Sequence, residues 1–212
     1  MSAREAVNVL KLYYAPGACS LAAHIVLEES GEKYALTRVD LAKGEQRTEA
    51  YLQIHPQGRV PALQLDSGEN ITENTAILPY LGKRFGLWPS EPTAEARALS
   101  WIGLFAASVH PAHAHISRPE RYASDAAHFP ALQDMGRKTF HGYLTQIDRA
   151  LSGRQWLSDQ YSVLDPYALT FYAWGLRREL PVAGLKHYSA FKDRMLARPA
   201  VQRVLAEEKV KV

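Results

Sequence analysis

The sequence predicts a small α/β half joined to an all-helical half. Strand and helix patterns alternate over roughly the first 85 residues. The breakers Gly86, Pro89 and Pro92 that follow are typical of a linker. Beyond them no alternating strand pattern occurs, and long apolar stretches recur at helical spacing. We therefore expect one domain over residues 10–86 and a second, all-helical domain over residues 93–212.

The first strand, helix and strand follow from composition and breakers. Val9–Tyr14 is a β-branched and aromatic run that Pro16-Gly17 closes, which predicts a strand and a loop. Apolar residues then recur at helical spacing up to Gly31, where a left-handed cap would end the helix. The segment Tyr34–Leu41 is predicted to form the second strand.

The rest of this half contains a short helix, a hairpin and a longer helix. A polar loop leads into a predicted helix over residues 50–54. Residues 62–65 and 70–72 are separated by turn residues and predict an antiparallel hairpin. Residues 73–85 carry a helical apolar stripe. Because a helix joins the first two strands, we expect those two to be parallel.

The second half is predicted to be helical throughout. Its apolar-periodic stretches cover about residues 93–116, 130–152, 163–179 and 184–206, with breakers at Pro119, Gly153, Pro181 and Pro199. Ser162 is the expected N-cap of the third stretch. Asp165 then stands where the positive end of a helix favours an acidic residue.

Composition excludes several classes of protein. With 47% hydrophobic and 22% charged residues among 212, the chain is neither disordered nor fibrous. The 25 basic residues barely exceed the 22 acidic ones and form no long cluster, so we expect no nucleic-acid partner. No stretch approaches the roughly 18 apolar residues of a membrane span. Glu5 and Asn8 interrupt the region where a signal peptide would be apolar, so we expect a cytoplasmic protein.

Cys19 is the single cysteine and the first candidate for chemistry. It follows a strand and a turn and opens a helix, where free N–H groups and the helix dipole stabilise a thiolate. In such a position the pKa of a thiol falls from about 8.5 toward or below 7. The alternative is a buried, inert cysteine. Ser20, at the same junction, is expected to donate to a ligand thiolate, to cap the helix, or both.

Other motifs admit two interpretations each. Val60-Pro61, before a strand, is a candidate cis peptide. Residues 72–75 form either an anion-binding helix start or an ordinary cap. His110, His113 and His115 raise the question of a metal site, but no cysteine or acidic pair completes their spacing. We therefore predict that no metal is bound.

Taken together, these motifs resemble a known family. The run Lys11–Leu21 followed by His24–Glu28 strongly resembles the opening of bacterial beta-class glutathione transferases. His55–Leu63 is similar to the family's loop before the third strand, and Leu65–Gly68 with Thr72 and Glu73 is similar to its glutathione-binding turn. The second half contributes further matches at Trp101, Phe105, His110 and residues 162–165.

The resemblance implies a fold, an activity and partners. The fold would be a thioredoxin-like N-terminal domain of order βαβαββα followed by an all-helical C-terminal domain, assembled as a homodimer. The activity would be detoxifying conjugation, in which the thiolate of glutathione attacks a small apolar electrophile. Glutathione would be a co-substrate, and no other cofactor is expected. Two alternatives are glutathione-dependent thiol–disulfide exchange through Cys19 and a non-catalytic carrier of apolar ligands.

The resemblance also implies site residues. Cys19, Ser20 and His110 are expected to contribute to catalysis beside the glutathione sulfur. Ala18 would contact glutathione near the same atom, and Val60 with a cis Pro61 would pair with its cysteinyl backbone. Glu73 and Asn74 would bind the γ-glutamyl end, and Lys43 and Arg59 would make charged contacts to the tripeptide. Trp174 and Arg177 would border the electrophile site.

Two positions depart from the family pattern. Where a lysine follows the histidine in the family, this chain has Pro111, and where an asparagine follows the tryptophan it has Gly103. Proline lacks an N–H and disfavours a helical residue before it, so we expect the helix to bend or end at Pro111. Gly103 removes a side chain that would tie the active-site loop to the second domain.

Overall fold

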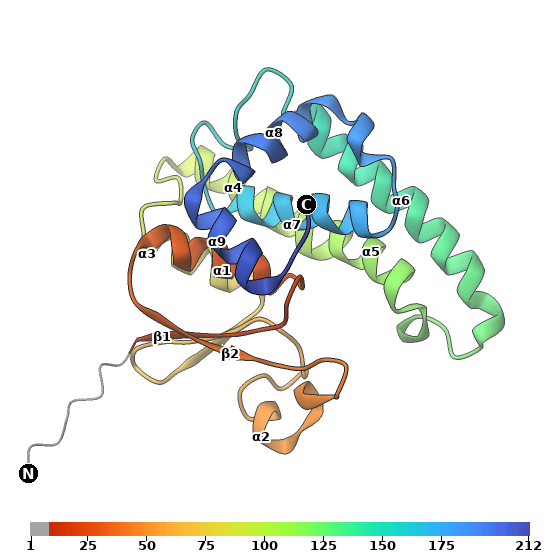
Figure 1. Cartoon of the computed structure of the whole chain (residues 1–212), viewed down its shortest axis with the longest axis horizontal. Helices are drawn as coiled ribbons and strands as arrows, with labels where there is room; N and C mark the ends of the chain where they lie inside the picture. The colour runs from red at the N-terminus through yellow and green to blue at the C-terminus, as the bar shows by residue number, and fades with distance from the viewer. Residues whose placement is uncertain (1–8) are drawn as a thin grey trace, which may run out of the picture.

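The computed structural model describes residues 9–212 and contains a four-stranded sheet and a set of helices (Figure 1). The elements of the first half are β1 (Leu10–Tyr14), α1 (Ser20–Ser30), β2 (Tyr34–Arg38), α2 (Glu49–Leu52), β3 (Ala62–Gln64), β4 (Asn70–Thr72) and α3 (Asn74–Arg84). Those of the second half are α4 (Pro92–Leu104), α5 (His110–Ser117), α6 (Phe129–Ala150), α7 (Leu164–Arg177), α8 (Lys186–Leu196) and α9 (Pro199–Glu208).

The sheet has the strand order β2-β1-β3-β4. β1 pairs in parallel with β2 because α1 crosses between them, and β1 and β3 pair antiparallel. β3 and β4 form the predicted hairpin. This mixed sheet with its order βαβαββα is the expected thioredoxin-like arrangement, and the helical second half is confirmed as well.

Helix α1 lies at the centre of the molecule. It packs against β1 and α3 on one side and against α7 and α9 on the other, while α2 lies on the opposite face of the sheet (Figure 1). Every residue from Ser20 to Leu27 is therefore buried, whereas a surface helix would keep a polar face. Gly31 ends the helix with φ of 70°, as the sequence predicted.

One apolar core runs through both halves. It joins strand residues such as Leu12 and Leu63 to helix residues such as Phe105 and Phe171, each of them 0% exposed. Edge-to-face aromatic contacts link Phe105 to Phe171 and Tyr167 within it. The loop that follows β1 is consequently held between two layers that share their packing.

Several predicted boundaries are corrected. The second strand ends at Arg38, before Leu41, because Val39 donates its N–H to Tyr14 and the chain then turns. The stretch predicted over residues 184–206 is two helices, divided where Pro199 occupies the first turn of α9.

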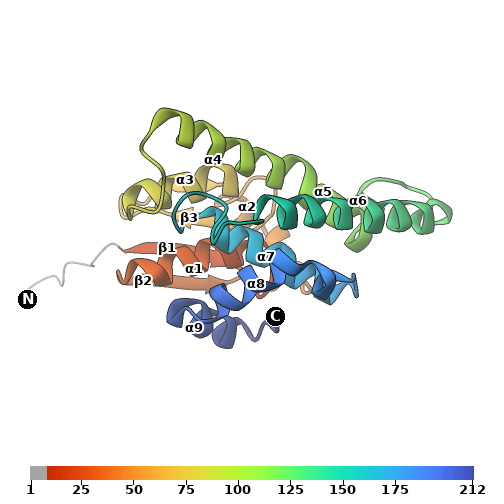
Figure 2. The same ribbon diagram turned by 90° about the horizontal axis from the view of Figure 1, so that it is seen from above.

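The helix around Pro111 differs from the prediction. Helix α4 continues into α5 through a π-helical turn, Phe105–Val109, so the two helices run end to end along one side of the molecule (Figure 2). The prediction of a bend or end at Pro111 was wrong: the helix continues past Pro111, and the π-helical turn directly before it accommodates the residue that lacks an N–H. An added Cβ at Gly103 would meet no atom within 4 Å, so this position makes no tie to the active-site loop.

The start of α7 shows a reciprocal cap that is shifted by one residue. The structure begins the helix at Leu164 with Val163 at the N-cap, so the assignment of Ser162 as N-cap is corrected. The Ser162 hydroxyl still accepts from the N–H of Leu164 at 3.3 Å, and the Asp165 carboxylate accepts from the N–H of Ser162 at 2.8 Å.

Over residues 9–212, none of the helices combines the length and apolarity that crossing a bilayer requires.

Candidate active site

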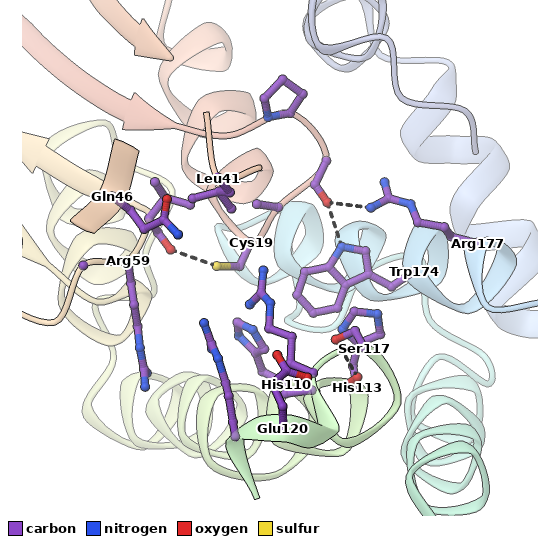
Figure 3. Close-up of a pocket in the computed structure, with 18 of the residues that line it drawn as sticks. Cys19, Leu41, Gln46, Arg59, His110, His113, Ser117, Glu120, Trp174 and Arg177 are labelled. Carbon is purple, nitrogen blue, oxygen red and sulfur yellow. Dashed lines mark hydrogen bonds between the residues drawn. The ribbon is translucent and has the colours of Figure 1, made fainter. Parts of the chain in front are cut away.

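A large cavity lies between the two halves. It has a volume of about 600 Å³ and is bounded by the loop Pro16–Cys19 on one side and by residues of α5 and α7 on the other (Figure 3). A recess of about 240 Å³ adjoins it and reaches Glu73 and Asn74 at the start of α3. Cys19, Arg59, Val60 and His110 border both spaces, so the two adjoin at these residues.

Cys19 lies at the junction of the two spaces, but its environment differs from the one predicted. Its residue is only 8% exposed, and Sγ–H donates to the carbonyl of Val60 at 3.2 Å. Burial raises the pKa of the thiol to about 12, although nearby Arg118 acts in the opposite direction. The expectation of an exposed thiol with a lowered pKa was wrong, because loss of water outweighs the helix start.

Ser20 lies beside the site without facing it. The residue is fully buried, and its hydroxyl donates to the carbonyl of Ala15 and accepts from the Ala15 N–H, both at 3.2 Å. It borders neither the cavity nor the recess. Ser20 therefore closes the loop before α1, and the roles predicted for it as a donor to ligand sulfur and as an N-cap are corrected.

The loop that positions Cys19 is anchored from the second half. The carbonyl of Gly17 accepts from Trp174 Nε1 at 2.9 Å and from Arg177 Nη1 at 3.4 Å (Figure 3). The N–H of Gly17 donates to the carboxylate of Glu208 at 2.8 Å, and the same carboxylate bonds His24 Nδ1 at 2.7 Å. Both Trp174 and Arg177 line the cavity, and both also hold the loop.

The segment before β3 forms the opposite wall. The Val60-Pro61 peptide bond is cis, as predicted. Val60 and Arg59 border both spaces, and Pro61 borders the recess. The hydroxyl of Tyr51 donates to the carbonyl of Arg59 at 2.7 Å and fixes this wall.

Glu73 and Asn74 close the far end of the recess. Glu73 precedes α3 with φ of 70°, a left-handed conformation that is unusual for a residue with a side chain. Asn74 is buried, and its Nδ2 donates to the carbonyl of Cys19 at 3.0 Å. The start of α3 is thus bonded directly to the start of α1.

Two histidines of α5 face the cavity around the Trp174 indole. The ring of His113 stacks on Trp174 with centroids 4.2 Å apart, and His110 meets the same ring edge-on at 5.0 Å. Burial, reinforced by neighbouring arginines, lowers the pKa of His110 to about 4 and that of His113 to about 3. Both imidazoles are therefore neutral at pH 7.

The three histidines do not converge. His115 packs instead on Tyr122 with centroids 4.0 Å apart. Within the described part of the chain, no three histidine, cysteine or acidic side chains are placed to hold a metal ion.

Of the remaining predicted site residues, Lys43 lies away from the cavity and Ala18 lines it. The side chain of Lys43 is 76% exposed, lies 3.8 Å from Asp40 and borders neither space, so the structure does not bring it to the site. Ala18 lines the cavity next to Cys19.

Sequence reasoning missed an important part of the wall. Arg118 and Arg121 follow α5, Arg178 follows α7, and Gln46 and Arg47 belong to the loop before α2, yet all five border the cavity. No spacing rule points to them, because each lies in a loop or at a helix end. The one available signal was that Arg118 and Arg121 closely follow the histidine-bearing segment.

Comparison with known proteins finds relatives of this chain in one family. Residues 8–83 match the family described as glutathione S-transferase, N-terminal domain. The chain is 34% identical over 208 residues to the glutathione S-transferase GstA of Escherichia coli O157:H7, covering 95% of this chain and 100% of that protein.

Solved structures similar to this chain belong to the same family. A glutathione transferase homologue from Sulfitobacter, solved with bound glutathione, has 32% identity and a TM-score of 0.88, covering 94% of this chain and 98% of the other. A beta-class glutathione S-transferase from Sphingomonas chungbukensis has 30% identity and a TM-score of 0.82, covering 93% and 98%. The chain therefore belongs to the glutathione S-transferase family, as a member of its bacterial beta class.

Proposed function

We propose that this enzyme joins the sulfur of glutathione to an electrophilic carbon in the cavity between its two halves. The observation that carries the proposal is the continuity of the two spaces at Cys19, with the cis Val60-Pro61 wall on one side and Glu73 on the other. The bound glutathione of the Sulfitobacter homologue supports glutathione as the co-substrate here.

We assign glutathione to the recess in the following orientation. Its α-ammonium group would face the carboxylate of Glu73, and its γ-glutamyl end would lie by Asn74 at the start of α3. The backbone of Val60 would pair with the cysteinyl residue, which places the sulfur between Cys19 and His110. The guanidinium of Arg59 is then available to a glutathione carboxylate.

The wall of the site favours the thiolate of glutathione. The Cys19 thiol remains protonated, and with glutathione bound its single S–H would turn from the Val60 carbonyl to donate to the glutathione sulfur. Neutral His110 offers a ring N–H in one tautomer, and Arg118 adds positive charge nearby. Hydrogen bonds to an ionised acceptor are roughly twice as strong as neutral ones, so these groups lower the pKa of bound glutathione.

The reaction needs only these groups. The glutathione thiol gives its proton to water, and the resulting thiolate attacks the electrophilic carbon. A carbon–sulfur bond forms as the bond to the leaving group breaks. With an activated alkene, it forms as the carbon–carbon π bond breaks, and the resulting carbanion then takes a proton from water. The aromatic faces of Trp174 and the two α5 histidines are suited to the apolar part of the electrophile.

Thiol–disulfide exchange and the carrier role are not favoured. Exchange requires a thiolate on the protein, and burial keeps Cys19 protonated. We also propose a homodimer, which follows from the family, and a cytoplasmic location, because thiols are kept reduced there.

The test is titration calorimetry with reduced glutathione, run in parallel with conjugation of chlorodinitrobenzene. Binding together with turnover above the uncatalysed rate supports the proposal. Binding without turnover would return weight to the carrier, and absence of binding would contradict the assignment of the recess to glutathione.

A further inference from the structure

Six arginines line the active-site cavity. They come from the loop before α2, the segment before β3, the end of α5 and the end of α7: Arg47, Arg59, Arg118, Arg121, Arg177 and Arg178. Glu120 is the one acidic residue in the same lining, and the two histidines are neutral. Arg59 and Arg177 lie on opposite sides of Cys19 (Figure 3), so the positive charge surrounds the reacting position.

None of these six arginines has a carboxylate partner in the described part of the chain. Within residues 9–212, the arginine–carboxylate pairs closer than 4.0 Å all involve other arginines, namely Arg84, Arg154, Arg198 and Arg203. Arg178 instead donates from Nε to the ring nitrogen of His113 at 3.3 Å. Among the described residues, no carboxylate within 4.0 Å therefore neutralises the arginines of the cavity.

This concentration of charge is unfavourable without an anion. Burial and then the neighbouring guanidinium groups lower the pKa of Arg121 and of Arg178. The charge of Arg118 contributes to lowering both pKa values. Arg118 follows α5, whereas Arg178 follows α7. Like charges from separate elements thus act on one another across the cavity.

Helix ends do not account for the cluster. Arg118 follows α5 and Arg177 ends α7, where basic residues complement the negative end of a helix. Each helix end carries about half a negative elementary charge, so the two together offset roughly one of the three positive charges of Arg118, Arg177 and Arg178. About two remain for a ligand.

In the proposed orientation glutathione does not contact this part of the wall, although the charge of Arg118 acts on its sulfur from nearby. In the orientation proposed above it occupies the recess, whose basic residues are Arg59 and Arg121. Arg118, Arg177 and Arg178 border only the larger cavity, together with His113, Ser117 and Trp174. The second substrate lies there.

We propose that the electrophile carries a carboxylate or a similar anionic group, held by Arg118 and Arg178, while its apolar body packs on Trp174. This assignment of substrate class rests on the proposed transferase function. It refines the apolar electrophile expected from the family, because the aromatic surface is retained and the charged group is added at one end.

The experiment compares two electrophiles that differ in one charge. Chloronitrobenzoate, with its chlorine beside the nitro group, and its primary amide react with glutathione by the same displacement of chloride. For each compound, the value of kcat/KM is divided by the rate constant of the uncatalysed reaction. We expect the wild-type enzyme to favour the carboxylate by about tenfold or more, since a hydrogen bond to a charged group has that strength.

Variants assign the preference to the arginines. In Arg118→Gln and Arg178→Gln the ratio of carboxylate to amide efficiency should fall by about tenfold, with the loss mainly in KM for the carboxylate. Arg118→Lys should restore part of it. Arg149→Gln removes the same charge from an exposed position on α6 and should leave the ratio unchanged. Far-ultraviolet circular dichroism checks that each variant is folded.

The outcomes separate this inference from the proposed function. Conjugation of both compounds with equal normalised efficiency would overturn the inference and leave the transferase intact. Absence of both glutathione binding and turnover would overturn the proposed function itself. If excess glutathione inhibits the wild type but not Arg118→Gln, and the carboxylate is not preferred, the arginines hold a second glutathione and the inference is overturned.

Discussion

At the scale of single residues, burial decides the chemistry of this site more than position along the chain does. Cys19 stands at a helix start, which favours a thiolate, yet the packing around it raises the pKa of its thiol. The hydrogen bond to the Val60 carbonyl also requires the protonated form. The residue is therefore a donor, and the nucleophile must come from glutathione.

Replacing Cys19 tests this role. In Cys19→Ala we expect conjugation to fall by about tenfold or less, because one hydrogen bond to the glutathione thiolate is lost. Cys19→Ser, which keeps a donor, should lie closer to wild type. The measurement is kcat/KM with chlorodinitrobenzene at saturating glutathione. A loss of a thousandfold in the alanine variant would show that the cysteine is essential to conjugation.

His113 makes stability depend on pH. Its pKa is about 3 in the folded protein, against an ordinary value of about 6.5 in the unfolded chain. Between these values the unfolded chain binds a proton that the folded protein does not. Stability is therefore fully present above about pH 6.5 and falls as pH drops toward 3.

The size of this effect is measurable by urea unfolding. Lowering the pH from 7.5 to 5 should cost about 2 kcal/mol of unfolding free energy through His113 alone. In His113→Gln, which keeps an acceptor for Arg178, that part of the decline should disappear. An unchanged slope in the variant would mean that other groups cause the decline.

At the scale of elements, the last helix holds the first loop. Glu208, at the end of α9, is 3% exposed and bonds both the Gly17 N–H and His24 of α1. Trp174 and Arg177 of α7 bond the carbonyl of the same glycine. An element almost two hundred residues away in the chain therefore fixes the backbone that carries Cys19.

Removal of this carboxylate should be costly. Glu208→Ala leaves a buried histidine and a backbone N–H without their acceptor, so we expect a loss of about 3–5 kcal/mol in unfolding free energy. The KM for glutathione should also rise, because the loop before Cys19 loses one of its anchors. Glu207→Ala is the matched control, since that side chain is 51% exposed and lies 3.6 Å from His24, and it should cost less than about 1 kcal/mol. Equal losses in both variants would contradict this role of Glu208.

At the scale of the whole molecule, we propose that residues 10–86 and 93–212 are two structural domains that do not unfold independently. The strands lie before the linker, but the apolar core continues across it through α1 and α7. Arg198, the residue before α9, also forms a bidentate pair with Glu29 of α1, with N–O distances of 2.6 and 2.9 Å. We expect two parts that share a core and this half-buried ion pair to unfold together.

The natural probes test this cooperativity. Trp88, Trp101, Trp156 and Trp174 all follow α3, whereas Cys19 lies in the first half. Urea titrations followed by tryptophan fluorescence and by alkylation of Cys19 should therefore give the same midpoint. Exposure of Cys19 at clearly lower urea than the fluorescence change would show that the first half unfolds separately.

The sequence by itself determined the fold class, the order of the elements and the first-half wall of the site. Local signals carry these features, because periodicity, breakers and the motifs around Cys19, Val60 and Glu73 are contiguous in the chain. The tertiary structure alone decided the protonation of Cys19, the inward role of Ser20 and the convergence of Arg118 and Arg178 on one cavity. Burial and charge–charge distance depend on residues far apart in sequence, and no local pattern records them.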